Sequence, residues 1–355
     1  MTELTRIAIA TRKVIKYGFV VIVAIVLLRG LFIFGYGVYK IRYPDPPPAP
    51  TVAFGGLPKI PFPQDTKPIE SLTLQTPSGE LPVFPDQLNV YFMPNLSSNL
   101  FSLENAKILA TKLGFSALPQ KLSETQYSFT NPNVPSQLKI NIVTGAFSVS
   151  YNLQEDPSPF ESRPYAPEVA ISNVKSFLSS AGLLPVDFTG TPKHEFLRRD
   201  GNNLVTAISL STADFVKINL YRKGFAGNSL INPPLENLPS LTARQDQSNV
   251  WFIVSGERKR EKQIIAGEYH YLPVDEEKVS TYPIITAQQA LDKLKAGEGF
   301  ILKETNKSNI VIRRIYLGYF DPGVESGFLQ PIVVFEGDNE FVAYVPAVTS
   351  EYYGK

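Results

Sequence analysis

The chain has 355 residues, a formal net charge of +1 at pH 7 and a pI near 7.7, so it lacks the strongly basic field that nucleic acid binding requires. It contains no cysteine, which excludes disulfides, thiol catalysis and zinc–thiolate sites. With 43% hydrophobic and 19% charged residues, it has the composition of a globular protein and is long enough for more than one domain.

An apolar segment close to the N-terminus predicts a membrane-spanning helix. Residues 17–39 lie between Lys16 and Lys40, and as a helix they would extend about 35 Å, enough to cross a hydrocarbon core of ~30 Å. The segment is longer than the apolar part of a signal peptide and no Ala-x-Ala-like cleavage site closes it, so we expect an uncleaved anchor. Basic residues are in excess before the segment. This predicts a single-pass protein of the cell membrane, with residues 1–16 cytoplasmic and the C-terminal body extracytoplasmic.

Arg29 lies near the middle of the predicted span, where a charged side chain costs about 2.5–3.5 kcal/mol. Two interpretations remain open. In the first, a helix partner such as the transmembrane helix of another protein supplies a carboxylate or backbone carbonyls to Arg29. In the second, the Arg29 side chain reaches the headgroup region while the bilayer thins locally. The first interpretation makes Arg29 a candidate partner contact.

Residues 40–70 are rich in proline and predict an extended spacer between membrane and body. Proline favours polyproline-like backbone, and at ~3.1 Å per residue the segment from Pro44 to Pro68 would reach up to roughly 75 Å. Some of its side chains are too apolar for a purely solvated linker, and we expect that they could dock on the body: Phe54, Leu57, Ile60 and Phe62.

From Ser71 onward, helix and strand signals alternate, which predicts an α+β fold of repeated helix-plus-antiparallel-sheet modules rather than one continuous sheet. The predicted modules are residues 71–160, 161–280 and 281–355. Capping residues and terminal glycines predict helices over residues 102–114, 167–181 and 286–297, the last with a Thr286–Gln289 capping box. Alternating apolar residues predict strands over residues 127–130, 137–152 (a hairpin), 193–199, 204–211, 215–222, 250–255, 263–272, 309–320, 329–336 and 341–348.

Four segments of the last module carry a family resemblance: Tyr282-Pro-Ile-Ile-Thr-Ala-Gln-Gln-Ala-Leu-Asp-Lys-Leu, Ile315-Tyr-Leu-Gly-Tyr-Phe, Leu329-Gln-Pro-Ile-Val-Val-Phe-Glu-Gly and Phe341-Val-Ala-Tyr-Val-Pro-Ala-Val. They resemble the C-terminal module of the YycH/YycI-type extracytoplasmic regulators. The resemblance implies one transmembrane helix, a tethered body of PepSY-like modules, no catalysis, and restraint of a membrane sensor histidine kinase. The long proline-rich spacer and Arg29 depart from the family pattern, and no functional residue is transferred.

Enzymatic interpretations are limited by the two histidines of the chain, His194 and His270. His194 with Glu195 could position a base for a serine nucleophile, although a strand histidine is usually structural. His270 could bind a divalent ion together with the acidic triplet of residues 275–277, although a solvated loop is the simpler interpretation of that triplet. Paired carboxylates for glycoside cleavage are not visible in a sequence, and a hydrolase is the less favoured alternative. We therefore expect no catalytic residue, metal or cofactor.

Residues 257–262 form a run of six charges between two apolar strands and predict a solvent-exposed hairpin tip. Arg258, Lys259 and Arg260 are candidate contacts for an acidic partner or an anionic polymer. The predicted function is that of a non-enzymatic envelope protein whose outer body binds or regulates a membrane partner, for which the family resemblance implies a sensor kinase. The alternative is an envelope scaffold or a module that binds cell-wall glycan through aromatic residues. Most of the aromatic candidates occupy core-compatible strand positions; the candidates are Tyr91, Tyr127, Phe129, Phe147, Tyr151, Trp251 and Phe252.

Overall fold

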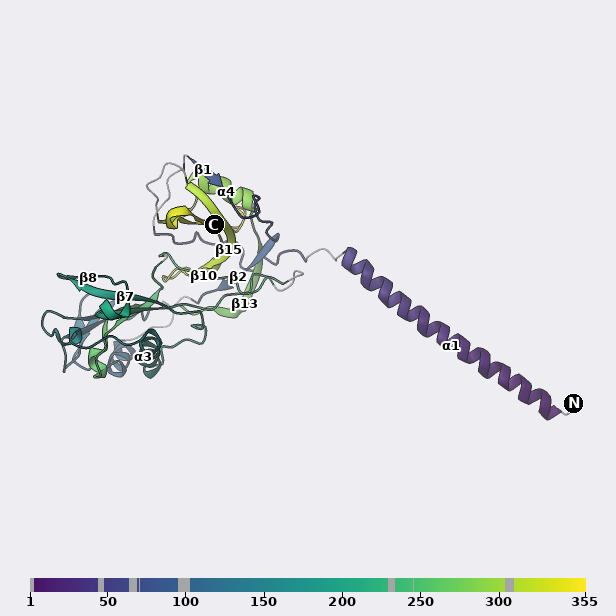
Figure 1. Ribbon diagram of the computed structural model, residues 1–355, viewed down its shortest axis with the longest axis horizontal. Coiled ribbons are helices and arrows are strands. Elements are labelled where there is room, and N and C mark those ends of the chain that lie inside the picture. Colours follow the sequence, from purple (N-terminus) through teal and green to yellow (C-terminus); the bar gives the residue numbers. More distant parts are fainter. Residues whose placement is uncertain are drawn as a thin grey trace. The chain divides into compact units, whose positions relative to one another are not determined.

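The computed structural model describes residues 3–43, 48–63, 69, 71–94, 103–228, 234–244, 246–303 and 310–355. The chain divides into an N-terminal unit, Met1–Ala49, and a compact body, Pro50–Lys355 (Figure 1). The first unit contains helix α1 (Glu3–Arg42), whose residues Thr11–Lys40 are long and apolar enough to cross a membrane, with a mean hydropathy of 2.6. The predicted span of residues 17–39 lies entirely within this helix.

The body contains two sheets, the first of which has nine strands in the order β3-β4-β5-β6-β12-β11-β9-β7-β8. Neighbouring strands are antiparallel throughout. Helices α2 (Leu103–Lys112) and α3 (Pro167–Ser180) contribute apolar side chains to the core on one face of this sheet. The strands are β3 (Gln120–Lys121), β4 (Gln126–Thr130), β5 (Ser136–Asn141), β6 (Phe147–Tyr151), β7 (Lys193–Asp200), β8 (Asn203–Thr206), β9 (Phe215–Leu220), β11 (Val250–Val254) and β12 (Ile264–Tyr269).

Alternation in β5 shows how the sequence assigns the faces of this sheet. Leu138 and Ile140 are buried in the core beneath the helices, whereas Lys139 between them is exposed. On the opposite face a smaller apolar cluster lies beneath a loop that contributes Leu153 and Phe160. The remainder of that face carries polar side chains. The nine-stranded sheet is therefore covered completely on one face and only partly on the other.

The second sheet has eight strands. Its central order is β1-β15-β16-β17-β14, with β10 also paired to β15, and β2 paired to both β13 and β16. The strands are β1 (Leu72–Leu74), β2 (Gln87–Phe92), β10 (Ser240–Leu241), β13 (Asp275–Pro283), β14 (Phe300–Lys303), β15 (Ile310–Phe320), β16 (Phe328–Gly337) and β17 (Val342–Pro346). Short 3₁₀ helices occur at η2 (Ser158–Phe160), η3 (Leu210–Thr212), η4 (Arg260–Lys262) and η5 (Asp338–Glu340).

Helix α4 (Ala287–Ala296) packs against β17. Its predicted capping box is confirmed: the backbone N–H of Gln289 donates to the Thr286 hydroxyl, and the backbone N–H of Thr286 donates to the Gln289 side chain. The helix ends at Gly297, whose φ of 82° lies in the left-handed region that glycine adopts most readily.

Both faces of the eight-stranded sheet are covered. Val333 and Phe335 of β16 lie in the core that contains α4, while their neighbours Ile332 and Val334 point to the other face. There they pack in a cluster with residues from the N-terminal and C-terminal ends of the body, including Ile60, Phe62 and Tyr353. Because strands buried on both faces favour apolar residues at every position, residues 332–335 of β16 and 342–345 of β17 are continuous apolar runs.

The two sheets differ from the predicted modules in their boundaries. Strands from the predicted modules 71–160 and 161–280 join in one continuous nine-stranded sheet, because the β11–β12 hairpin inserts between β6 and β9. Conversely, β1 and β2 from the first predicted module pair with strands of the last one. Long-range pairing of this kind leaves no signal in local periodicity, which is why the boundaries were misplaced.

The structure also differs from the predicted spacer of residues 40–70. Residues 51–62, here called the docked segment, lie on the body: Leu57 is fully buried, and its backbone N–H donates to the carbonyl of Tyr352 (2.7 Å). Thr51 donates from its backbone N–H to the hydroxyl of Thr281 (2.9 Å). The expected docking of apolar spacer residues is therefore confirmed, and only residues 43–49 connect α1 to the body. Parts of the predicted spacer, residues 44–47, 64–68 and 70, lie outside the described residues, as does Ser102, the predicted cap of α2.

Candidate functional site

A buried ion cluster joins the two sheets. Arg222 follows β9 of the nine-stranded sheet, and its Nε donates to Asp321 (2.8 Å), which follows β15 of the eight-stranded sheet. The same guanidinium donates to Asp187 and to the carbonyl of Leu272, and it lies over the ring of Tyr271 at 4.4 Å. All three charged side chains are at least nine-tenths buried.

The charges in this cluster depend on one another. Burial by itself lowers the pKa of Arg222, but the carboxylates of Asp321 and Asp187 outweigh burial and hold that pKa above its usual range. Burial, assisted by Asp187, raises the pKa of Tyr271 to about 12. Removing Arg222 would leave two carboxylates in the interior without their cation, so the cluster holds the sheets together only while it is complete.

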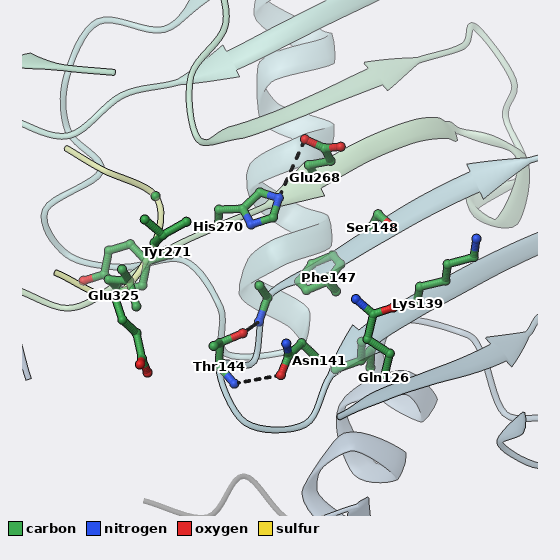
Figure 2. Close-up of a pocket in the computed structure, with 15 residues that line it drawn as sticks. Gln126, Lys139, Asn141, Thr144, Phe147, Ser148, Glu268, His270, Tyr271 and Glu325 are labelled. Carbon is green, nitrogen blue, oxygen red and sulfur yellow. Dashed lines mark hydrogen bonds and ion pairs between the residues drawn. The ribbon is translucent and has the colours of Figure 1, made fainter. Parts of the chain in front are cut away.

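Next to this cluster, a groove of about 460 Å³ lies between the two sheets (Figure 2). One wall is formed by the partly covered face of the nine-stranded sheet, where Lys139, Ser148 and Glu268 occupy one row across β5, β6 and β12. The other wall is the loop of residues 323–325, which follows β15. A cavity of this volume is within the range of binding sites for small ligands or peptide segments.

The loop on the second wall is held in place by specific contacts. Asn249 donates from Nδ2 to the carbonyl of Asp321 (3.0 Å), and the Asn249 carbonyl accepts from the backbone N–H of His270 (2.9 Å). Gly323 has a φ of 64°, and a Cβ at this position would lie 2.7 Å from Asn249 Oδ1. Only glycine fits at this position without strain. The Asn249 contacts that hold this loop also lie next to the cluster that joins the sheets, so the groove is preformed.

The two ends of the groove differ in charge. Figure 2 shows Lys139 and Gln126 at one side and Glu325 and Tyr271 at the other, with His270 and Phe147 between them. Glu268 accepts from Trp251 Nε1 (3.2 Å) and lies 3.7 Å from His270 Nε2. By contrast, the side chains of Gln126, Lys139 and Ser148 make no hydrogen bond or ion pair with any other residue that the structure describes. The groove thus offers unused polar groups and a cation at one end.

The charged run of residues 257–262 connects β11 and β12, which confirms the predicted hairpin. The run is not wholly a solvated tip, however. Lys262 pairs with Asp156 (2.6 Å) and donates to Ser158, and Glu257 accepts from the hydroxyl of Ser162. Lys262 lies in η4, where the turn directs its ammonium toward the loop of residues 153–160. Prediction from charge alone missed this orientation.

Three of the candidate partner contacts remain exposed on this run. Arg258 and Lys259 make no ion pair or hydrogen bond through their side chains within the described residues, whereas Arg260 donates to Ser180 Oγ (2.6 Å) at the end of α3. Arg29, the fourth candidate, is exposed on α1, and its side chain likewise makes no such contact in the described chain.

The histidines and their neighbouring carboxylates occupy separate places. His194 lies on β7 beside Phe196, and Glu195 accepts from the Thr206 hydroxyl. The acidic triplet of residues 275–277 opens β13 instead of lying in the predicted loop; Asp275 accepts from backbone N–H groups, and Glu276 pairs with Lys223. His270 contacts Glu268 rather than this triplet.

Most of the aromatic residues considered for glycan stacking are buried. Tyr127 and Trp251 are half-buried, and Lys217 lies over the Trp251 ring at 5.0 Å. The other five are at most 7% exposed and belong to the cores: Tyr91, Phe129, Phe147, Tyr151 and Phe252. The expectation that most of them occupy core positions is confirmed.

Sequence analysis missed the groove residues and Arg222. Alternation in β5 could have placed Lys139 on the polar face of its strand, and an arginine directly after the apolar run of β9 could have been marked as unusual. Neither signal shows that residues 321–325, far later in the chain, lie close to these two residues.

No family model matches the sequence, and no curated protein matches it. A search of solved structures found an uncharacterized protein from Eubacterium rectale ATCC 33656, which is 13% identical, with 81% of this chain and 90% of that chain covered at a TM-score of 0.40. It also found the Bacillus megaterium YpeB C-terminal domain, 14% identical, with 72% of this chain and 96% of that chain covered at a TM-score of 0.31. At these values no residue role or partner is transferred. The resemblance to YycH/YycI-type regulators stays an interpretation of the sequence.

Proposed function

We propose that this chain is a single-pass envelope protein with a cytoplasmic N-terminus, whose extracytoplasmic body binds and regulates a membrane protein without catalysing a reaction. One observation carries the proposal: the connection between α1 and the body is short. Seven residues, 43–49, separate Arg42 from Pro50, and a fully extended chain of that length spans at most about 25 Å. A body tethered this closely is best suited to a partner at the membrane surface.

The short connection also favours a contact made at two points. If α1 and the body both touch the same partner, the second contact forms at an effective concentration that the connection sets. Arg29 on α1 and the exposed Arg258 and Lys259 on the body are the candidate residues for the two contacts. The resemblance to YycH/YycI-type regulators makes a sensor kinase the first partner class to test.

The test lengthens the connection without disturbing the docked segment. A flexible Gly/Ser insert of about 20 residues between Ala49 and Pro50 increases the connection from seven to some 27 residues. Since effective concentration falls roughly as the −3/2 power of length, partner capture should fall about 5–10-fold. The measurement is the yield of partner crosslinked in native membranes to a photoreactive amino acid at position 259.

A matched control places the same crosslinker at Val83, which is 98% exposed and far along the chain from the charged run. Crosslinking to one membrane protein that depends on both the position and the connection length supports the proposal. Equal crosslinking with the short and long connections would contradict a two-point contact. Retention of the body by purified wall material, without a membrane partner, would support the glycan alternative instead.

A further inference from the structure

We propose that the groove between the two sheets binds an extended peptide segment of the partner, with an acidic residue beside Lys139, a basic residue beside Glu268 and an apolar residue between them. This inference rests on the proposed function and assigns it a binding site. It adds a site that the candidate contacts Arg29, Arg258, Lys259 and Arg260 do not include.

The first argument is the distribution of charge. Lys139 pairs in register with Ser148, and Ser148 pairs with Glu268, so the backbone positions of the cation and the carboxylate lie two strand spacings apart, about 10 Å. A peptide in the extended polyproline II conformation rises about 3.1 Å per residue with three residues per turn, so that side chains three positions apart lie on the same face, about 9 Å apart. Opposite charges at those positions therefore match this separation and complement the groove.

The second argument is the chemistry between the two ends. Ala146 is partly exposed in the lining, and Val324 on the facing loop is 53% exposed, so both offer apolar atoms to a ligand. Gln126, Asn141, Thr144 and Ser148 supply amides and hydroxyls, which can hydrogen bond with peptide groups. An apolar surface bordered by amide and hydroxyl groups fits a peptide backbone with one apolar side chain.

The third argument separates a peptide from a sugar. Glycan sites stack sugar rings on exposed aromatic faces, and of the groove's two aromatic residues Phe147 is only 2% exposed. Tyr271 is half-buried, and the Arg222 guanidinium lies over its ring. Neither ring offers a free face of the size that sugar stacking needs.

The loop of residues 323–325, which forms one wall of the groove, is held in place before a ligand binds. It is fixed by the Asn249–Asp321 hydrogen bond and by the Arg222 ion cluster. A preformed groove loses less conformational freedom on binding than a mobile one, so that more of the contact energy remains as affinity.

The probe is a phage-displayed library of linear random peptides, selected on the full-length protein in detergent. Enriched peptides are synthesised with a fluorescent label, and their Kd values are measured by anisotropy. We expect enriched sequences to contain an acidic and a basic residue about three positions apart around an apolar residue. Lys139→Glu should weaken binding at least tenfold, and replacing the acidic peptide residue with lysine should restore binding to that variant.

Ser148→Trp is a second variant, which fills the groove and should weaken binding without changing any charge. Arg198→Glu is the matched control: Arg198 is exposed on β7, outside the groove, so this charge reversal should leave Kd unchanged. Thermal unfolding of each variant shows whether it is folded.

Selection without an enriched motif, or enriched peptides whose Kd is unaffected by both groove variants, would overturn the peptide site. Those results would leave the membrane partnership standing if crosslinking still depends on connection length. Conversely, a membrane partner that is never captured, together with peptide binding in the groove, would reject the proposed function and keep the site.

Discussion

The two sheets of the body differ in how completely their faces are covered. Every residue of β17 is buried, and in β16 seven consecutive residues are buried. In β5 and β6 of the nine-stranded sheet, buried residues alternate with partly or fully exposed ones. The eight-stranded sheet has α4 on one face and the docked segment with the C-terminal residues on the other, whereas the nine-stranded sheet has helices on one face only.

From this difference we infer that the eight-stranded sheet chiefly contributes to the stability of the body, whereas the nine-stranded sheet contributes to ligand binding. A sheet covered on both faces has no surface left for a ligand, so its residues chiefly determine the free energy of unfolding. The partly covered sheet keeps polar side chains on this face, and among the described residues the side chains of Lys139 and Ser148 make no hydrogen bond or ion pair; both line a wall of the groove. We therefore expect substitutions in the two sheets to affect different measurements.

The largest effect is expected from the contact that joins the sheets. Arg222→Ala leaves Asp187 and Asp321 buried without their cation and should destabilise the body by about 3–5 kcal/mol. Because the sheets lose their coupling, urea unfolding followed by circular dichroism should broaden or separate into two transitions. Adding Asp187→Asn and Asp321→Asn to Arg222→Met should recover part of the loss. A single sharp transition at the wild-type midpoint for Arg222→Ala would show that the sheets are joined by other contacts.

The next effect tests how the eight-stranded sheet is enclosed. Leu57→Ala in the docked segment removes a fully buried side chain and should destabilise the body by about 2–4 kcal/mol. Val83→Ala, at a position that is 98% exposed, is the control and should change stability by less than about 0.5 kcal/mol. Equal urea midpoints for the two variants would mean that residues 51–62 act as a spacer after all.

A smaller effect is expected at the helix that covers the same sheet. Thr286→Ala removes the hydroxyl that accepts from the Gln289 N–H and should cost about 1 kcal/mol. Thr286→Ser keeps a hydroxyl at this position and should retain most of the stability. Thermal unfolding of both variants provides the measurement, and equal losses for alanine and serine would indicate that the methyl group matters rather than the cap.

The smallest effect concerns the loop that partly covers the nine-stranded sheet. The Lys262 ammonium and then the Tyr151 hydroxyl hold the pKa of Asp156 well below its usual range. A carboxyl whose pKa is lower in the folded state stabilises the fold above its unfolded pKa of about 4, and this contribution is lost as pH falls further. Urea midpoints between pH 7 and pH 3 should therefore fall less steeply for Asp156→Asn than for the wild type. Identical pH profiles would exclude a contribution from this ion pair.

Local signals accounted for most of the individual elements. The helix over residues 286–297 was predicted from Thr286, Gln289 and Gly297, because capping is a contact between near neighbours in the chain. The hairpins were predicted from alternation, which is equally local. Six strands were not predicted: β1, β2, β3, β10, β13 and β14. In β13 a bulge between Asp275 and Val279 interrupts the pattern, and the acidic start of that strand reads as a loop.

By itself, the sequence determined the apolar helix, the order of α and β elements and the apolar residues of both cores, since each of these depends on composition or on spacing along the chain. Tertiary structure alone decided which strands became neighbours, that residues 51–62 lie on the body, and that Lys262 turns inward while Lys259 stays exposed. It also decided that Arg222 meets Asp321 and that residues 323–325 face Lys139 across the groove. These contacts join residues far apart in the chain, and the free energy that selects among alternative pairings comes from burial of the whole core, which no local pattern records.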